Sequence, residues 1–273
     1  MRKLPRIRLV TFADGNLAYR LAAKRLKKEA IAAGVFTDIQ IYDRSRVLQE
    51  IATGDRQTAD FIQSKNRGFG YWLWKPMILD FELQRETENF DFLLYLDVGC
   101  VININPESRA KLLDYCSLSV SNGALVFHMN GYIENQWTKQ AALDYFESDS
   151  EMATSFQRLA TVIMLPNSEF SKNLVGTWLE ACNFEGHALL NDSLELKEID
   201  TLRAHRHDQS LWSLATKALG VKSISDETYH HPNWQSEGKN YPLWAARIVG
   251  FRKPQASQSF AAKVLFRLLK TIP

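Results

Sequence analysis

The chain has 273 residues, of which 45% are hydrophobic and 23% are charged, the ordinary composition of a globular protein. No run of about 18 apolar residues occurs, so we expect no transmembrane helix. Cys100, Cys116 and Cys182 are too few and too scattered for a disulfide framework or a zinc knuckle. These features together predict a cytoplasmic protein with a sizeable apolar core.

The charges are distributed unevenly along the chain, although the net charge is only +2. Residues 1–30 carry nine Lys or Arg and two acidic residues, and residues 238–273 carry seven Lys or Arg and no acidic residue. Residues 31–237 carry 17 basic and 29 acidic residues. Basic ends around an acidic middle favour an anionic partner at the ends, such as the inner face of a membrane. Ordinary solvated surface helices are the alternative interpretation.

Short β-branched runs and helical patterns alternate along the chain. The first strand, a helix that ends before Gly34 and the second strand predict a parallel, right-handed crossover. In chain order, the predicted elements are strand Arg6–Ala13, helix Asn16–Ala33, strand Thr37–Tyr42, a polar helical stretch to about Phe61, a turn-rich loop at Ser64–Gly70, helix Trp74–Glu88, strands Phe90–Leu96, Gly123–His128 and Thr161–Leu165, helices Glu169–Cys182 and Asp208–Leu219, and strand Val221–Ser225.

These elements predict the α/β class, with a mixed, mainly parallel central sheet flanked by helices. No linker or repeat interrupts the pattern before about residue 250, so residues 1–250 are predicted as one domain and residues 251–273 as a C-terminal appendage. From Phe260 onward, apolar residues recur at helical spacing, with Lys263, Arg267 and Lys270 on the other side. This basic amphipathic helix can lie on an anionic membrane surface or pack on the domain.

Asp97 directly follows the nearly all-apolar run Phe90–Leu96, which predicts a strand buried on both faces. Its carboxylate would therefore stand at the carboxyl end of the sheet, where the sites of open α/β folds lie. Hard divalent cations prefer such oxygen ligands. The alternative is a strand-terminal Asp that caps a turn through its side chain.

Arg67 and Lys75 flank the segment GFGYWLW. Gly68 would allow the backbone to approach a ligand closely, and the two cations could contact phosphates. Trp74 could stack on a base or sugar, although it could equally belong to the core. The segment is neither a Walker loop nor a dinucleotide-binding glycine fingerprint.

Three later segments carry further candidate residues. Asp208 and Gln209 precede a helix and can present a carboxylate and an amide to a polyol, or Asp208 can simply cap that helix. His230 or His231 could complete a metal site begun by Asp97, whereas a lone histidine is more often structural. Asp192 could orient an acceptor hydroxyl or merely turn the chain.

Several other classes of protein are excluded by motif. The chain has neither the G-x-S-x-G segment of serine hydrolases nor the H-E-x-x-H segment of zinc proteases. Its basic residues lack the aromatic interleaving of RNA-binding motifs, so no nucleic-acid partner is expected.

Four segments, in the same order, resemble a family of bacterial glycosyltransferase-like proteins linked to capsule, O-antigen and other surface polysaccharides. Residues 66–76, NRGFGYWLWKP, look like the family's RGFGYWxWKP segment, and residues 94–100, LYLDVGC, are similar to its LYLDAGC segment. Residues 134–139 (ENQWTK) and 205–210 (HRHDQS) also fit. The similarity runs from about residue 6 to about residue 235.

The resemblance implies a GT-A fold, a Rossmann-like domain that binds a nucleoside-diphosphate sugar, with a UDP-sugar as the favoured donor. In GT-A enzymes a D-x-D motif holds Mn²⁺ or Mg²⁺ against the diphosphate. Asp97 matches its first position, whereas Gly99 stands where the second carboxylate usually is. His230 or His231 would match the late histidine ligand of some GT-A families.

The roles expected for the other residues follow from the same resemblance. Asp208 would be the carboxylate near the anomeric carbon, Gln209 would contact sugar hydroxyls, and Arg67 with Lys75 would contact phosphates. The predicted function is a hexosyltransferase that extends a glycan or a lipid-linked glycan. A non-catalytic sugar-binding or assembly protein on a GT-A scaffold is the alternative. A nucleotidyltransferase is disfavoured because no glycine-rich basic loop follows the first strand.

Overall fold

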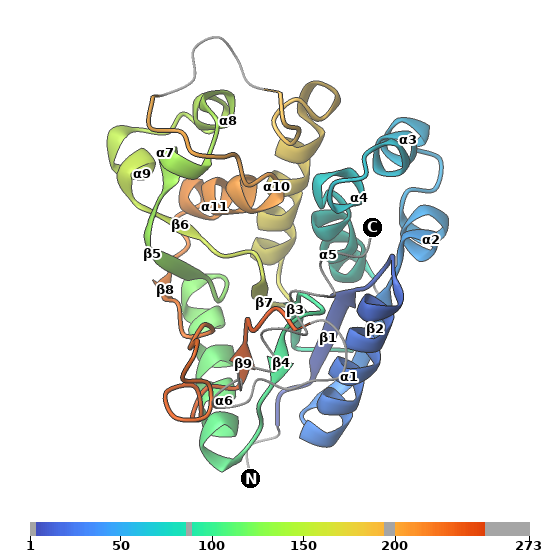
Figure 1. Cartoon of the computed structure of the whole chain (residues 1–273), viewed down its shortest axis with the longest axis vertical. Helices are drawn as coiled ribbons and strands as arrows, with labels where there is room; N and C mark the ends of the chain where they lie inside the picture. Colours follow the sequence, from blue (N-terminus) through green and yellow to red (C-terminus); the bar gives the residue numbers. More distant parts are fainter. Residues whose placement is uncertain (1–3, 86–88, 194–199, 249–273) are drawn as a thin grey trace, which may run out of the picture.

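The computed structural model describes residues 4–85, 89–193 and 200–248. Its central sheet has four strands in the order β2-β1-β3-β7 (Figure 1). β1 runs parallel to β2 and β3, and β7 runs antiparallel to β3. The strands are β1 (Ile7–Phe12), β2 (Phe36–Tyr42), β3 (Phe92–Leu96) and β7 (Val162–Pro166). The predicted α/β class with a mixed, mainly parallel sheet is confirmed.

Both faces of this sheet are covered, which explains why every residue of β1 and of β3 is buried. On one face Val10 and Tyr95 pack against α5 (Trp74–Gln84), α10 (Glu169–His187) and α11 (Asp208–Ala218). On the other face Leu9 and Leu94 pack against α1 (Leu17–Ala33) and α6 (Pro106–Asn122). Figure 1 shows the first group of helices toward the top of the view and the second toward the bottom.

The crossover between β1 and β2 begins and ends at the residues that the sequence marks. The Asn16 side chain accepts hydrogen bonds from the backbone N–H groups of Ala18 and Tyr19 at the start of α1. Gly34 ends the helix in the left-handed region at φ 60°, which favours glycine. Local signals of this kind explain why the opening β-α-β unit was predictable.

Two smaller sheets and a set of short helices complete the described part of the chain. One sheet has the order β6-β5-β8, and β4 pairs with β9. The additional elements are β4 (Val101–Ile102), β5 (Phe127–Ile133), β6 (Phe156–Arg158), β8 (Ile224–Ser225), β9 (Leu243–Trp244), α2 (Arg44–Arg46), the π-helix η1 (Val47–Ile51), α3 (Arg56–Ser64), α4 (Gly68–Tyr71), α7 (Glu134–Trp137), α8 (Gln140–Tyr145) and α9 (Ser150–Thr154).

The structure changes the bounds of several predicted elements. The strand expected at 123–128 begins only at Phe127 and continues to Ile133, because its far end pairs with β6. The helix expected to end at Cys182 extends to His187 with a kink at Phe184, Glu185 and Gly186, where the backbone leaves helical geometry, and the late strand is reduced to Ile224–Ser225. The predicted amphipathic helix at 251–273 lies outside the described residues. Among the helices that are described, none combines the length and apolarity needed to span a membrane.

Candidate functional site

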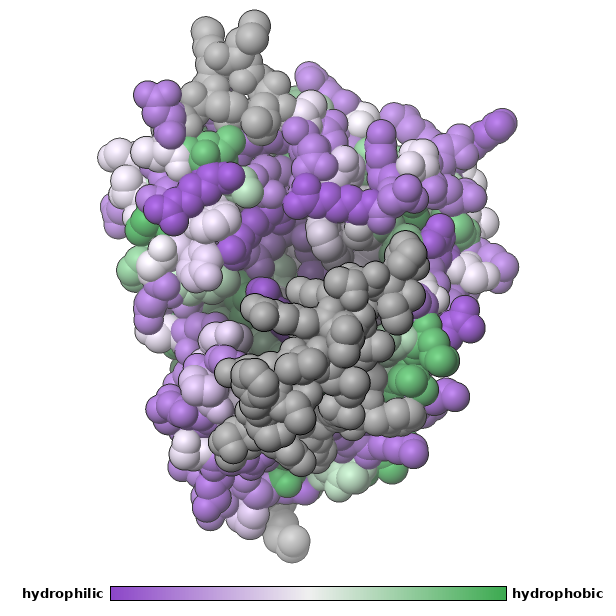
Figure 2. All heavy atoms as spheres, viewed as in Figure 1, coloured by the Kyte–Doolittle hydropathy of each residue, from purple (hydrophilic) through white to green (hydrophobic). Residues whose placement is uncertain are grey.

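A cavity of about 810 Å³ opens at the edge of the central sheet where β1 and β3 end. In open α/β sheets, ligands bind outside the carboxyl ends of the strands. Figure 2 shows this face of the molecule hollowed near its centre, with hydrophilic residues along the upper rim. Seven residues that the sequence singles out line the cavity: Arg67, Gly68, Trp74, Lys75, Asp97, Asp208 and Gln209.

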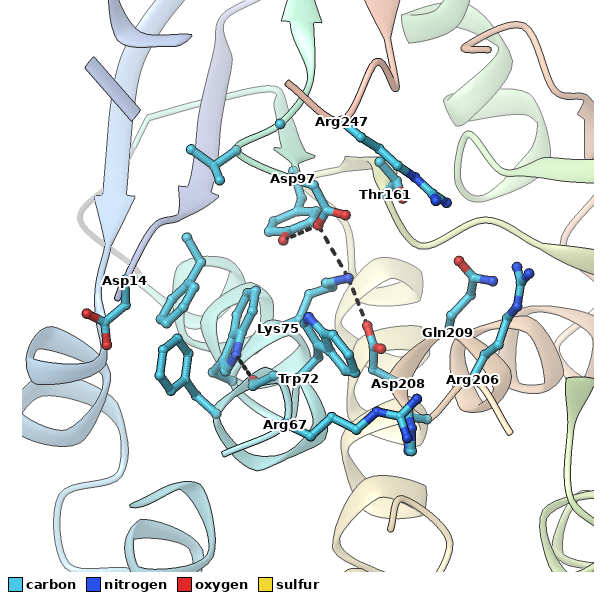
Figure 3. Close-up of a pocket in the computed structure, with 18 of the residues that line it drawn as sticks. Asp14, Arg67, Trp72, Lys75, Asp97, Thr161, Arg206, Asp208, Gln209 and Arg247 are labelled. Atoms are coloured by element: carbon cyan, nitrogen blue, oxygen red, sulfur yellow. Dashed lines mark hydrogen bonds and ion pairs between the residues drawn. The ribbon is translucent and has the colours of Figure 1, made fainter. Parts of the chain in front are cut away.

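Lys75, in the first turn of α5, links two carboxylates that come from separate elements (Figure 3). Its buried ammonium lies 2.8 Å from Oδ2 of Asp208 and 3.5 Å from Oδ1 of Asp97. It also donates a hydrogen bond of 3.2 Å to the Ala160 carbonyl. The Tyr95 hydroxyl donates to Oδ1 of Asp97 at 2.6 Å. Asp97 and Asp208 thus share one cation at the cavity wall.

The electrostatics of this group follow from its burial. Burial raises the pKa of Asp208 to about 6, although the Lys75 ammonium acts in the opposite direction. Burial alone would lower the pKa of Lys75, but the two carboxylates outweigh it, so that pKa is raised and the amine stays protonated. Asp208 is therefore mostly ionised at pH 7 and gains a proton near pH 6, a range that suits a general base.

The segment from Arg67 to Trp74 forms one wall of the cavity through a run of left-handed backbone. Phe69 and Trp72 have φ angles of 52° and 64°, which are strained for residues with a side chain. Gly68 tolerates its φ of 58°, and a Cβ there would lie 2.5 Å from the Trp72 ring. Trp74 donates to the Gly68 carbonyl at 2.8 Å and stacks on Phe12 at 3.8 Å between ring centroids. Gly68 and Trp74 therefore shape the wall.

Asp192 reaches the site only through its partners. Its carboxylate lies 2.7 Å from a guanidinium nitrogen of Arg67 and 3.4 Å from Nε2 of His207, both of which line the cavity. Asp192 itself is not among the described residues that line it. The structure thus connects Asp192 to the cavity through its contacts with Arg67 and His207.

The alternative in which Asp208 caps the helix is wrong, because His207 occupies the cap position of α11 and Asp208 is the first helical residue. His207 adopts φ 51° and ψ −118°, a conformation that is rare for a residue with a side chain. Its Nδ1 lies 2.8 Å from the Leu190 carbonyl, which holds the ring in place. The Asp208 carboxylate points toward Lys75 at the cavity wall (Figure 3).

The two histidines proposed as metal ligands occupy a different aromatic cluster. The His230 ring stacks on Tyr241 at 4.8 Å, and its Nε2 lies 3.0 Å from the Glu227 carbonyl. His231 lies beside Tyr229, and neither histidine is among the described residues that line the cavity. Within 4–85, 89–193 and 200–248, no three His, Cys, Asp or Glu side chains are grouped as a metal site requires. The metal site stays a prediction.

Gly99 is closely covered by a later part of the chain. A Cβ at this position would lie 3.1 Å from Cα of Arg247 and 3.3 Å from its carbonyl carbon. The Gly99 carbonyl also accepts a hydrogen bond of 2.9 Å from the Ile248 backbone N–H. A side chain at the position that would hold the second carboxylate of a D-x-D motif would therefore press on the Arg247 backbone, which would have to shift by a few tenths of an ångström.

Sequence reasoning did not single out two cations of the cavity, Arg206 and Arg247. Arg206 lies inside the HRHDQS segment, so its neighbours on the chain could have indicated it. Arg247 belongs to the basic C-terminal region and stands in no motif. Its place beside the cavity depends on the contact with Gly99, which only the folded chain shows.

Neither a scan against protein-family models nor a search of curated proteins finds a match to this chain. Among solved structures, it is similar to a glycosyltransferase involved in glycosylation of the major capsid of PBCV-1, with 9% identity, a TM-score of 0.42, and coverage of 97% of this chain and 100% of that chain. It is also similar to mouse xyloside xylosyltransferase 1 in its apo form, with 9% identity, a TM-score of 0.44 and coverage of 87% and 96%. Similarity at this level assigns no role to any residue.

Proposed function

We propose that this protein is a glycosyltransferase that moves a sugar from a nucleoside-diphosphate sugar to a hydroxyl of a glycan or lipid-linked glycan. The observation that carries the proposal is the buried Lys75, held between Asp97 and Asp208 at the wall of a cavity where two parallel strands end. Ionisable groups with strongly shifted pKa values cluster at functional sites, so a buried charged group at the wall of a cleft is a candidate for chemistry.

The cavity has the size and the two kinds of lining that such a donor requires. Its volume of about 810 Å³ lies in the range of small-molecule sites. At one end Phe69 and Tyr19 offer aromatic surface for a base, and Asp14 offers a carboxylate for ribose hydroxyls. At the other end Asp208 and Gln209 offer a carboxylate and an amide for the transferred sugar.

Asp208 is assigned as the group that accepts the proton of the acceptor hydroxyl. In the transfer, the acceptor oxygen forms a bond to the anomeric carbon, and its proton passes to the Asp208 carboxylate. The bond between the anomeric carbon and the diphosphate oxygen breaks, and its electron pair leaves with the nucleoside diphosphate. Lys75 keeps Asp208 ionised near neutral pH and fixes its position.

Gln209 is assigned to binding of the sugar. Its Nε2 donates to Oε1 of Gln157 at 2.9 Å, which fixes the orientation of the amide. The Gln209 side chain lines the cavity one residue beyond Asp208, at the first turn of α11. A fixed amide suits the hydroxyl pattern of one sugar because it presents both a donor and an acceptor.

The test is a panel of UDP-, GDP- and CDP-sugars, incubated with the protein and with glycan acceptors, with release of nucleoside diphosphate as the readout. We expect one donor to be turned over, and Asp208→Asn to lower the rate by about 10²–10⁴-fold while donor binding persists. Asp60→Asn is the control, because Asp60 is exposed on α3, and its rate should equal that of the wild type.

The outcomes separate the competing functions. Donor binding without any turnover would favour a non-catalytic protein on the same scaffold. Release of pyrophosphate from a nucleoside triphosphate would favour a nucleotidyltransferase. Unchanged turnover in Asp208→Asn would remove Asp208 from the mechanism.

A further inference from the structure

The carboxylates that line the cavity each have a cation beside them, and within the described ranges no three His, Cys, Asp or Glu side chains are grouped as a metal site requires. The pairs are Asp14 with Arg44 at 3.1 Å, Asp97 with Lys75 at 3.5 Å, and Asp208 with Lys75 at 2.8 Å. Oδ1 of Asp97 also accepts the Tyr95 hydroxyl. Mg²⁺ and Mn²⁺ need several oxygen ligands at one point, and this donor set does not provide them.

Two cationic side chains of the cavity, Arg206 and Arg247, differ from these carboxylates because they have no oppositely charged partner among the described residues. Within the described ranges, Arg206 and Arg247 form no ion pair with a carboxylate, and both line the cavity. The Arg206 guanidinium lies over the Trp137 ring at 4.2 Å and over the Tyr132 ring at 4.6 Å, and its Nη1 lies 3.7 Å from Sδ of Met129. Burial lowers the pKa of Arg206, and the nearby charge of Arg247 acts in the same direction. Two neighbouring guanidinium groups therefore repel each other until an anion arrives.

Figure 3 shows the side chains of Arg206 and Arg247 on the same side of the cavity as Gln209, the residue next to Asp208. An anion held by both guanidinium groups would thus lie beside the reacting sugar. A guanidinium group binds phosphate oxygens through two parallel N–H donors, which gives both charge and orientation. This geometry matches the place where the leaving group of the proposed reaction separates from the sugar.

The position of Arg247 is fixed by the backbone around it. The Ile248 N–H donates to the Gly99 carbonyl at 2.9 Å, and the Ala245 N–H donates to the Thr228 carbonyl at 2.7 Å. Arg25 donates to the Ile248 carbonyl at 3.3 Å. Arg247 is held between these contacts at φ 53°, a strained value of the kind that accompanies functional sites.

We infer that Arg206 and Arg247 bind the diphosphate of the donor and neutralise its charge as it leaves, so that transfer proceeds without a divalent metal ion. The inference rests on the proposed function and adds to it the group that stabilises the leaving diphosphate. Preorganised cations aimed at developing negative charge are an established route to catalysis. The backbone that packs tightly on Gly99, where a D-x-D motif would have its second carboxylate, is the backbone that carries Arg247.

The test is isothermal titration calorimetry with UDP, GDP and CDP, each in EDTA and each with Mn²⁺ or Mg²⁺. We expect one nucleoside diphosphate to bind the wild type equally well in EDTA and with metal, within about twofold. Arg247→Ala should weaken this binding by about ten- to a hundredfold, and Arg206→Lys by a smaller factor. Arg56→Ala is the matched control, because the Arg56 side chain on α3 is 94% exposed, and its affinity should be unchanged.

Each other outcome has a separate meaning. Binding that requires metal would overturn the inference and leave the proposed function intact. Equal nucleotide affinity in Arg247→Ala and wild type would also overturn it, and a raised KM for an acceptor in that variant would show that the pair recognises an anionic acceptor. If no nucleoside diphosphate binds under any condition, the proposed function fails and the inference fails with it.

Discussion

Within the part of the chain that the structure describes, Lys75 and Lys217 each lie buried beside carboxylates, and Lys75 borders the cavity. Lys217 contacts Glu134, a fully buried carboxylate that also accepts hydrogen bonds from Ser213, Thr138 and Gln157. Lys75 contacts Asp97 and Asp208 at the cavity wall. The pKa values of the two lysines move in opposite directions. Burial lowers that of Lys217 against the effect of Glu134, whereas two carboxylates raise that of Lys75 despite burial.

The comparison teaches that burial of a charged pair does not by itself mark a functional site. The lone pairs of Glu134 are satisfied by protein donors, so this cluster ties α7 to α11 and β6. Asp208 lines a cavity that a ligand can enter. The first cluster should therefore serve stability and the second should serve chemistry.

Among the substitutions that test this comparison, Glu134→Gln should have the largest effect on the free energy of unfolding. Removal of one member of a buried ion pair leaves the Lys217 charge without compensation and should lower the free energy of unfolding by about 3–5 kcal/mol. Urea denaturation of the variant and the wild type measures this difference. Activity per folded molecule should be unchanged, and a loss of turnover at full stability would contradict the structural role of Glu134.

Gly99→Ala should lower the free energy of unfolding by less, because it disturbs only the backbone at Arg247 that packs on Gly99. The added methyl group would lie 3.1 Å from Cα of Arg247, so the backbone there has to move, at a cost of about 1–3 kcal/mol in stability. Nucleoside-diphosphate affinity should fall as well, because Arg247 is displaced. Thermal denaturation and calorimetry measure both quantities.

Gly176→Ala is the matched control for that substitution. Gly176 lies inside α10, and a Cβ there has no neighbour within 4 Å among the described residues. Alanine in a helix interior should raise stability by about 0.5–1 kcal/mol and leave ligand affinity alone. If Gly99→Ala and Gly176→Ala changed stability and ligand affinity equally, the packing of the Arg247 backbone on Gly99 would have no effect on either quantity.

The pH dependence of transfer should reflect the Lys75 cluster. Burial raises the pKa of Asp208 to about 6, so the base loses its charge as the pH falls through 6. The rate should be constant near pH 7–8 and fall about tenfold per pH unit below 6. A rate profile at saturating donor measures this limb, and a flat profile between pH 5 and 8 would exclude Asp208 as the base.

The smallest expected effect is that of Asp208→Asn on stability. The raised pKa of Asp208 means that the folded state favours its protonated form, so the stability contributed by that proton is present at acid pH and is lost as the pH rises through about 6. Loss of the ion pair with Lys75 opposes the relief of the buried charge. The free energy of unfolding at pH 7 should therefore change by less than about 1 kcal/mol. If Asp208→Asn lowered the free energy of unfolding as much as Glu134→Gln does, both clusters would serve stability.

The fold was predictable where the signals are local. The apolar run of β3, the start of α1 near Asn16 and its end at Gly34 depend on neighbouring residues, and each stands close to its predicted position. The antiparallel direction of β7 and the pairing of β4 with β9 depend on partners far along the chain. A single sequence holds no signal for such pairings, so they had to come from the structure.

The site was predictable as separate residues but not as a constellation. Asp97, Lys75 and Asp208 were each indicated by their place in a segment, yet no local signal indicated that Lys75 lies between the two carboxylates. That relation depends on three elements meeting in space. Arg247 carried no local signal, since its position is set by the backbone packed on Gly99.

The contact between Arg25 and the Ile248 carbonyl has a consequence for how the protein is made. It joins residues that are 223 positions apart, so the cavity wall that carries Arg247 closes only when nearly all of the described chain has left the ribosome. The central sheet needs nothing beyond Pro166, the last residue of β7. We therefore expect a nascent chain to assemble its sheet early and to remain unable to bind a diphosphate until Ile248 has left the ribosome.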